Sequence, residues 1–178
     1  ISFSTAIDAL RLANRMLCWK SYDWRLAAVD GQPVKASNGV EVSVNTSLAD
    51  ERRMLAGRER PDMVFVCSGI NVENFADKSV LGWVREEHKR GVSVGGLCTG
   101  AYILASAGLL SGRRCAIHWE NLPGFQEKFP KADVYADLFE VDGNVWTCAG
   151  GTAALDMMLS MIAKTTTKTS STRSANKH

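Results

Sequence analysis

The sequence has 178 residues, 46% of them hydrophobic and 22% charged, with a formal net charge of +2. This length suits one domain with a sizeable core, and the near balance of charge gives no reason to expect nucleic acid or a membrane as a direct partner. The longest apolar stretch, residues 102–110, is interrupted by Ser106 and Gly108 and is far too short to span a bilayer.

The first third of the chain alternates between helical and extended patterns. Apolar residues at helical spacing predict an amphipathic helix over residues 4–17. Residues 24–29 predict a strand, and residues 34–44, where valines alternate with polar residues, predict an exposed strand or hairpin. Residues 50–60 are charged, and we expect a short helix or a loop there.

The middle of the chain holds a compact apolar run, residues 63–67, and a second segment of the buried kind, residues 93–97. Runs of this kind are typical of strands covered on both faces of a parallel sheet. Each is followed by a helical pattern, over residues 77–90 and 99–107 respectively. The pattern therefore predicts two consecutive strand–helix units.

The last part of the chain predicts a short strand at 114–117 and a helix at 119–129 that ends before Pro130. Residues 138–141 and 145–148 flank Asp142-Gly143-Asn144, a strong hairpin signal. Residues 151–163 predict a closing helix.

The repeated order of strand and helix predicts an α/β sandwich with a mostly parallel sheet. A first helix in such a fold normally follows a strand, so we expect that strand upstream of Ile1. We assign residues 1–163 to one domain. Residues 164–178 are rich in Thr, Ser and Lys without apolar periodicity, which is typical of a tail or linker.

The five cysteines are odd in number and contain no C-x-x-C pair; they are Cys18, Cys67, Cys98, Cys115 and Cys148. This arrangement argues against a disulfide framework and against a zinc site, and it favours a reducing cytoplasm. We expect most of these side chains to be buried, and we predict no metal and no cofactor.

Cys98 stands out because it lies in Gly96-Leu97-Cys98-Thr99-Gly100, between a predicted buried strand and a helix. Ligands bind outside the carboxyl ends of strands in open α/β sheets, and a sharp strand-to-helix turn places its central side chain there. The start of the helix is expected to favour the thiolate or to hold an anion. The alternative is a small buried residue in a tight turn. Gly69 follows the other buried strand and is expected at the same edge.

A cysteine nucleophile needs a base, and histidine is the usual one. His118 follows a predicted strand and is a candidate for the same pocket, although a histidine beside Trp119 is as often a packed residue as a base. His88 lies in the charged segment Glu86-Glu87-His88-Lys89-Arg90, where a solvated helix face is expected, and His178 lies in the predicted tail.

Two long segments make the sequence recognisable: GLCTGAYILASAGLLSGRRCAIHWENLPGFQEKFP, which begins at Gly96, and DLFEVDGNVWTCAGGTAALDMML, which begins at Asp137. They closely resemble the ligand-sensing domain of AraC-type transcriptional regulators, in the subgroup that is similar to class I glutamine amidotransferases and PfpI-like proteins. The blocks HWEN at 118–121 and CAGGT at 148–152 are the most specific part of this resemblance, which extends from about Ala6 to Ala163.

The resemblance implies a flavodoxin-like three-layer sandwich that forms a homodimer. It also implies that DNA is bound only through a C-terminal domain with two helix-turn-helix motifs, for which the residues after Lys164 have neither the length nor the apolar pattern. Relatives of this subgroup respond to amino acids and quaternary amines such as arginine, betaine or carnitine. Aromatic side chains suit quaternary cations, and Trp119 and Trp146 are the candidates here.

Reactive-cysteine members of the superfamily place an acid beside the cysteine, six residues before a second acid in the first helix. Asp8 matches the second acid, so the first position falls on Ser2, which is unable to act as a carboxylic acid. The resemblance therefore implies an incomplete catalytic pair, with Cys98 retained as a pocket residue and Asp8 in a structural role.

The leading hypothesis is a cytoplasmic sensor domain that binds a small effector and is not an enzyme. Its expected ligand-binding residues are Gly69, Ile70, Cys98, Thr99, His118 and Trp119. The alternative is a Cys98-dependent hydrolase or hydratase of the PfpI-like superfamily, which the strand-to-helix turn and His118 favour and Ser2 disfavours.

Overall fold

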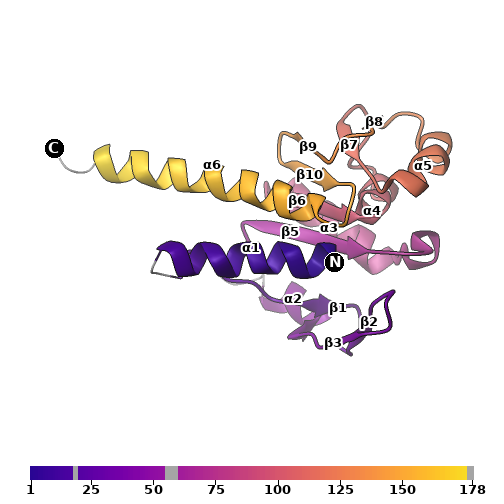
Figure 1. Cartoon of the computed structure of the whole chain (residues 1–178). Helices are drawn as coiled ribbons and strands as arrows, with labels where there is room; N and C mark the ends of the chain where they lie inside the picture. The colour runs from indigo at the N-terminus through magenta and orange to yellow at the C-terminus, as the bar shows by residue number, and fades with distance from the viewer. Residues whose placement is uncertain (18–19, 55–59, 176–178) are drawn as a thin grey trace.

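A computed structural model describes residues 1–17, 20–54 and 60–175 of the chain (Figure 1). Its centre is a four-stranded sheet in the order β5-β6-β10-β9, built from Met63–Ser68, Ser93–Cys98, Val145–Cys148 and Phe139–Asp142. Strands β5, β6 and β10 are parallel, and β9 is antiparallel to β10. The two buried apolar runs thus become adjacent parallel strands, and the predicted turn at Gly143 closes the β9–β10 hairpin with a φ of 61°.

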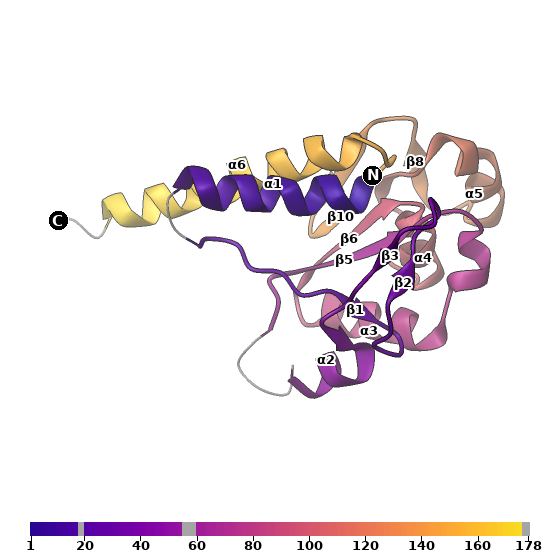
Figure 2. The same cartoon turned by 60° about the horizontal axis from the view of Figure 1, so that its bottom comes forward.

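Helices cover both faces of this sheet, as Figures 1 and 2 show. Helices α1 (Ser2–Leu17) and α6 (Ala153–Ala175) lie side by side on one face, and α3 (Lys78–Lys89) and α4 (Gly100–Ser106) cover the other. Each face has its own buried cluster. The α1–α6 side includes Ala9, Leu97, Trp146, Cys148 and Met157, and the α3–α4 side includes Val84, Val94, Leu104, Leu110 and Val145. The fold is the mostly parallel three-layer α/β sandwich that was predicted.

Shorter elements surround the central sheet. Three pairs of strands lie outside it: β1 (Ala27–Ala28) with β4 (Thr46–Ser47), β2 (Val34–Lys35) with β3 (Glu41–Val42), and β7 (Arg114–Ala116) with β8 (Asp133–Tyr135). The remaining helical elements are α2 (Leu48–Met54), η1 (Val72–Phe75), η2 (Trp119–Asn121) and α5 (Leu122–Lys128). Among the described residues, no strand pairs with the outer edge of β5.

Most predicted elements are confirmed, and the differences have local causes. The strand expected at 24–29 shrinks to β1, and β4 and β8 were not predicted because strands of two or three residues leave no period to detect. The segment at 50–60 is helical as α2, with residues 55–59 outside the described part.

The closing helix, expected to end at Ala163, continues to Ala175. Back-bonds from the hydroxyls of Thr165 and Thr166 to carbonyls one turn earlier accompany this extension. Whether residues 164–178 serve as a linker stays a prediction. A search of the described helices finds none with the length and apolarity that a bilayer crossing requires.

Candidate functional site

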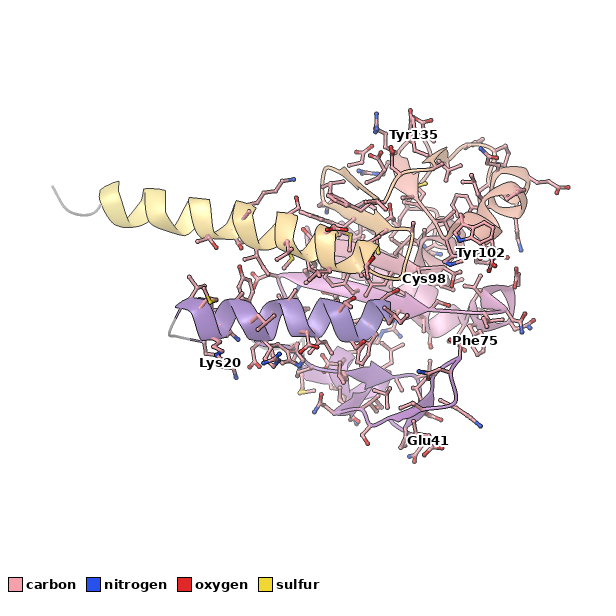
Figure 3. The ribbon with its side chains drawn as sticks, in the orientation of Figure 1. Lys20, Glu41, Phe75, Cys98, Tyr102 and Tyr135 are labelled. Atoms are coloured by element: carbon pink, nitrogen blue, oxygen red, sulfur yellow. The ribbon has the colours of Figure 1, made fainter. Side chains whose placement is uncertain are left out.

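The three parallel strands end at one edge of the sheet, and the chain segments that follow them meet there. Residues Ser68, Cys98 and Cys148 close β5, β6 and β10, and Ser68 pairs in register with Cys98. Figure 3 shows Cys98 at this edge, beside the beginnings of α1 and α6. Three strands and the beginnings of two helices therefore converge on the position that the sequence singled out.

The turn at Cys98 depends on close backbone packing. Cys98 has a left-handed φ of 61°, which is uncommon for a residue with a side chain. A Cβ on Gly96 would lie 2.5 Å from the backbone nitrogen of Ala101, and one on Gly100 would lie 2.3 Å from the carbonyl oxygen of Val66. The two glycines thus allow α4 to start directly against β5 and β6, which turns Cys98 toward the sheet edge.

The Cys98 thiol is half-buried, and burial raises its pKa above the ordinary value. The N–H of Thr99, which donates a hydrogen bond to the sulfur, acts in the opposite direction and is outweighed. Nearby Cys148 and the carboxylate of Glu120 raise the pKa further. The start of α4 thus favours the thiolate through the Thr99 N–H, as expected, but burial outweighs this contribution and the pKa of the thiol is raised.

The segment between β10 and α6 packs against Cys98. A Cβ on Gly150 would lie 2.9 Å from the Sγ atom of Cys98 and 3.2 Å from its Cα atom. The sulfur of Cys148, which is fully buried, accepts hydrogen bonds from the backbone N–H groups of both Cys98 and Gly150. Sequence reasoning did not find Gly150 as a contact of Cys98, because a glycine-rich block carries no signal for its tertiary neighbour.

Thr99 joins the ends of two strands. Its hydroxyl donates a hydrogen bond of 2.7 Å to the carbonyl oxygen of Gly69, and the residue is almost fully buried. Gly69 and Thr99 are therefore brought together as predicted neighbours, although the Thr99 hydroxyl is engaged within the protein. Ile70, next to Gly69, is 69% exposed.

His118 and Trp119 lie after β7 and stack on each other, with ring centroids 5.8 Å apart. The Nδ1 atom of His118 is 3.8 Å from Oε2 of Glu120, and Trp119 is 71% exposed. Among the described residues, no hydrogen bond joins His118 to Cys98. The arrangement therefore provides an exposed aromatic face beside an acid, and it does not provide a cysteine–histidine pair.

The other tryptophan considered for a ligand cation is already covered. Trp146 is buried in β10, and the Nζ atom of Lys164 lies 4.9 Å from the centre of its ring. Trp119 is thus the tryptophan of the two whose face is open.

The start of α1 lies beside Cys98, as Figure 3 shows. In the part of the chain that the structure describes, no carboxylate and no hydroxyl of Ser2 hydrogen-bonds the Cys98 sulfur. Asp8 is exposed and accepts a 2.8 Å hydrogen bond from Arg11 within α1, in line with the structural role expected of it.

Two hollows lie away from Cys98. One, with a volume of about 290 Å³, lies between α1 and α6, and the other, of about 260 Å³, lies between the end of α4 and the segment 128–132. Neither is lined by Cys98. Cys67, Cys98, Cys115 and Cys148 are free thiols, and no cluster of metal-ligating side chains occurs among residues 1–17, 20–54 and 60–175.

A profile of the DJ-1/PfpI family matches residues 1–164. The chain belongs to the DJ-1/PfpI family. This assignment agrees with the three-layer fold and with the sharp turn that carries Cys98.

Among curated proteins, the chain is 39% identical over 164 residues to the HTH-type transcriptional regulator CdhR of Pseudomonas aeruginosa, covering 92% of this chain and 46% of that protein. It is 34% identical to the regulator GbdR of the same species, with coverages of 92% and 43%. The chain thus spans less than half the length of these two relatives. A more distant relative is the isonitrile hydratase of Pseudomonas putida, 29% identical over 132 residues that cover 72% of this chain and 53% of that enzyme.

Solved structures lead to the same family. An AraC family transcriptional regulator from Pseudomonas putida superposes with a TM-score of 0.76 at 26% identity, covering 92% of this chain and 84% of that one. Drosophila melanogaster DJ-1beta superposes with a TM-score of 0.73 at 23% identity, with coverages of 92% and 82%; this second likeness shows the fold alone.

Proposed function

We propose that the chain is the effector-sensing and dimerisation domain of an AraC-type transcriptional regulator of the cytoplasm, and that it is not an enzyme. The observation that carries the proposal is the match to CdhR, which takes in 92% of this chain and under half of the regulator. In this proposal, DNA is contacted only by a helix-turn-helix domain that these 178 residues do not include, and the effector must bind two states of the protein with different affinities.

The proposed effector site lies at the sheet edge and comprises Gly69, Ile70, Cys98, Thr99, His118 and Trp119. Its chemistry suits a small metabolite with a cationic group, such as an amino acid or a quaternary amine. The open face of Trp119 favours a cation, and the exposed carboxylate of Glu120 adds a negative charge beside it. The half-buried Cys98 thiol supplies a neutral wall, because its pKa is raised.

Thermal unfolding with L-arginine and glycine betaine tests this site. A ligand at one hundred times its Kd stabilises a protein by about 2.7 kcal/mol, which corresponds to a rise in Tm of roughly 5–10 °C for a chain of this size. We expect such a rise with at least one of the two cations. It should persist in Cys98→Ala and be lost in Trp119→Ala. The matched control ligand is 3,3-dimethylbutanoate, which has the shape of betaine without its positive charge.

Two outcomes would contradict the proposed ligand class. One is an equal rise in Tm with 3,3-dimethylbutanoate, which would remove the role of the cation. The other is an undiminished rise in Trp119→Ala, which would place the ligand elsewhere. The absence of any shift with either cation would leave a domain that only dimerises.

The proposed dimer forms through α1 and α6. Their outer surface holds the 290 Å³ hollow, which is lined almost entirely by apolar side chains of the two helices: Ala9, Leu12, Ala13, Met16, Leu17, Leu155, Leu159, Ile162 and Thr166. Met16 is 81% and Leu159 51% exposed. Two adjacent helices about 10 Å wide, with α1 about 24 Å long, give a face of roughly 500 Å² in projection. Because side chains make the accessible area larger than the projected area, this face approaches the roughly 800 Å² per partner that a standard interface buries.

Light scattering on the purified chain tests this surface. We expect twice the 19.4 kDa of one chain for the wild type and the monomer mass for Leu159→Glu, because a paired interface would bury the new carboxylate. The matched control is Val40→Glu, which places the same charge on an exposed valine of the β2–β3 hairpin. A monomeric wild type, or a dimer that survives Leu159→Glu, would contradict the assignment.

The similarity to an isonitrile hydratase favours a second candidate, a Cys98-dependent hydratase or hydrolase. Against it stand the raised pKa of Cys98 and a sulfur that no described carboxylate hydrogen-bonds. Turnover of a small isocyanide or amide that disappears in Cys98→Ala would establish this candidate in place of the sensor.

A further inference from the structure

We propose that Gly150 is a positioning residue. When a group binds at the Cys98 thiol, the contact between Gly150 and Cys98 carries the resulting displacement to the beginning of α6. The inference rests on the proposed function and names the contact that links the effector site to α6. It does not depend on which effector binds, because it concerns the contact between two residues of this chain.

The contact leaves no spare room. A Cβ on Gly150 would approach the Sγ, Cβ and Cα atoms of Cys98 to 2.9, 3.0 and 3.2 Å, so no side chain fits between Gly150 and Cys98. The turn at Cys98 is itself held by Gly96 and Gly100 against the backbone of α4 and β5. A group added to the half-buried sulfur therefore lies next to Gly150, while the backbone that carries Cys98 is held by the packing of the two other glycines. We infer that Gly150 moves.

Gly150 is tied directly to the first turn of α6. Its carbonyl oxygen accepts a 3.1 Å hydrogen bond from the N–H of Ala153, and its N–H donates to the sulfur of Cys148. Gly150 and Gly151 both have left-handed φ angles, of 96° and 57°. A displacement of Gly150 therefore strains the hydrogen bonds that begin the helix.

Helix α6 extends this connection away from the sheet. It runs beside α1 in both views of the fold, and Lys164 anchors it to the ring of Trp146 (Figures 1 and 2). Over its 23 residues the helix is about 34 Å long. A displacement of the first turn of α6 therefore acts on a helix whose other end lies far from the Cys98 thiol.

Methyl methanethiosulfonate provides a probe that needs no known effector. The Cys98 thiolate attacks the sulfenyl sulfur of the reagent, a new S–S bond forms, the S–SO₂ bond breaks, and methanesulfinate leaves with the electron pair. The product carries an added S–CH₃ group on Cys98. The experiment uses the 178-residue chain with Cys18 and Cys67 replaced by serine, and Cys98→Ala in the same background is the control.

Hydrogen exchange followed by mass spectrometry reports on α6. We expect modification of Cys98 to raise the exchange rate of the amides of residues 153–158 about tenfold, while amides of α3 keep their rates. The control protein treated with the reagent should show no change. Full modification of Cys98 with unchanged exchange in residues 153–158 would overturn the proposal, and it would leave ligand binding measured by thermal unfolding unaffected.

A change at Gly150 should also alter access to the Cys98 thiol, because the two residues are in contact. The methyl group of Gly150→Ala would lie 2.9 Å from the sulfur and obstruct an incoming reagent, so we expect the rate of Cys98 modification to fall about tenfold. The matched variant is Gly151→Ala: it sits at the same turn with the same left-handed φ problem, yet no atom lies within 4 Å of its new Cβ.

The proposal is supported if Gly151→Ala changes the hydrogen exchange of α6 but leaves the rate of Cys98 modification unchanged. A merely structural role of the turn would not separate the effects of the two glycines on that rate. Equal effects of both substitutions on the Cys98 rate would contradict it. If Gly150→Ala does not fold, the modification of the wild-type thiol decides the question alone.

Discussion

Replacing Gly100 by alanine is expected to lower the free energy of unfolding by about 3 kcal/mol, the upper end of the range for over-packing. The new Cβ would lie 2.3 Å from the carbonyl oxygen of Val66, and because both partners belong to backbone, neither is able to swing aside. For a chain of this size such a loss lowers Tm by roughly 6–12 °C. Urea unfolding should show a lower midpoint with an unchanged slope.

Gly124 offers the matched control in helix α5. No heavy atom lies within 4 Å of a Cβ placed there, so Gly124→Ala should be neutral or should stabilise the protein by up to about 1 kcal/mol through the lower entropy of the unfolded chain. A comparable loss from both substitutions would mean that the close approach of α4 to β5 is not what Gly100 provides.

The same local packing explains why much of the fold was predictable. The strands β5 and β6 consist mainly of apolar residues and glycine because helices cover both faces of the sheet. The β9–β10 hairpin follows from a turn that needs a left-handed residue at Gly143. The glycines around Cys98 predicted its sharp turn for the same reason. Structural features that depend on residues close together in the chain can therefore be predicted from one sequence.

The electrostatics of the site could not be predicted in this way. The helix start suggested a thiolate at Cys98, whereas burial raises the pKa of this thiol, and two of its neighbours, Cys148 and Gly150, are remote from it in sequence. Glu120, which also raises that pKa, was read only as part of a family block. Such contacts depend on tertiary packing and leave no periodic pattern.

The two tryptophans illustrate the same limit. Trp119 and Trp146 were both named as candidates for a cation, because their side-chain chemistry is identical, and only Trp119 was also placed among the expected ligand-binding residues. Packing distinguishes them: Trp146 lies in the core under Lys164, and Trp119 stands open beside His118. The extension of α6 likewise covers a segment that composition alone predicted as a tail; there the hydroxyls of Thr165 and Thr166 donate to the carbonyl oxygen of Ile162 within the helix.

The thiol of Cys98 is expected to react with iodoacetamide at pH 7 several-fold more slowly than free cysteine, since only the thiolate is the nucleophile. Because burial places the pKa above its ordinary value, the thiolate fraction at pH 7 falls below that of a free thiol. For the same reason, the rate should keep rising with pH through the range in which free cysteine already levels off. The measurement is the alkylation rate against pH, in the background that lacks Cys18 and Cys67, with Cys98→Ala to subtract other reactions.

Replacing Ser2 by glutamate provides the counterpart to this measurement. The family resemblance places an acid at this position in reactive-cysteine proteins, and α1 begins beside Cys98. The substitution therefore tests whether the absence of this carboxyl group is the reason for the low reactivity of the thiol. A wild-type rate that levels off below pH 7 would contradict the sensor, because it would reveal an activated thiolate that burial does not suppress. A slow, rising profile in the wild type together with an altered one in Ser2→Glu would locate the difference between sensing and catalysis at a single side chain.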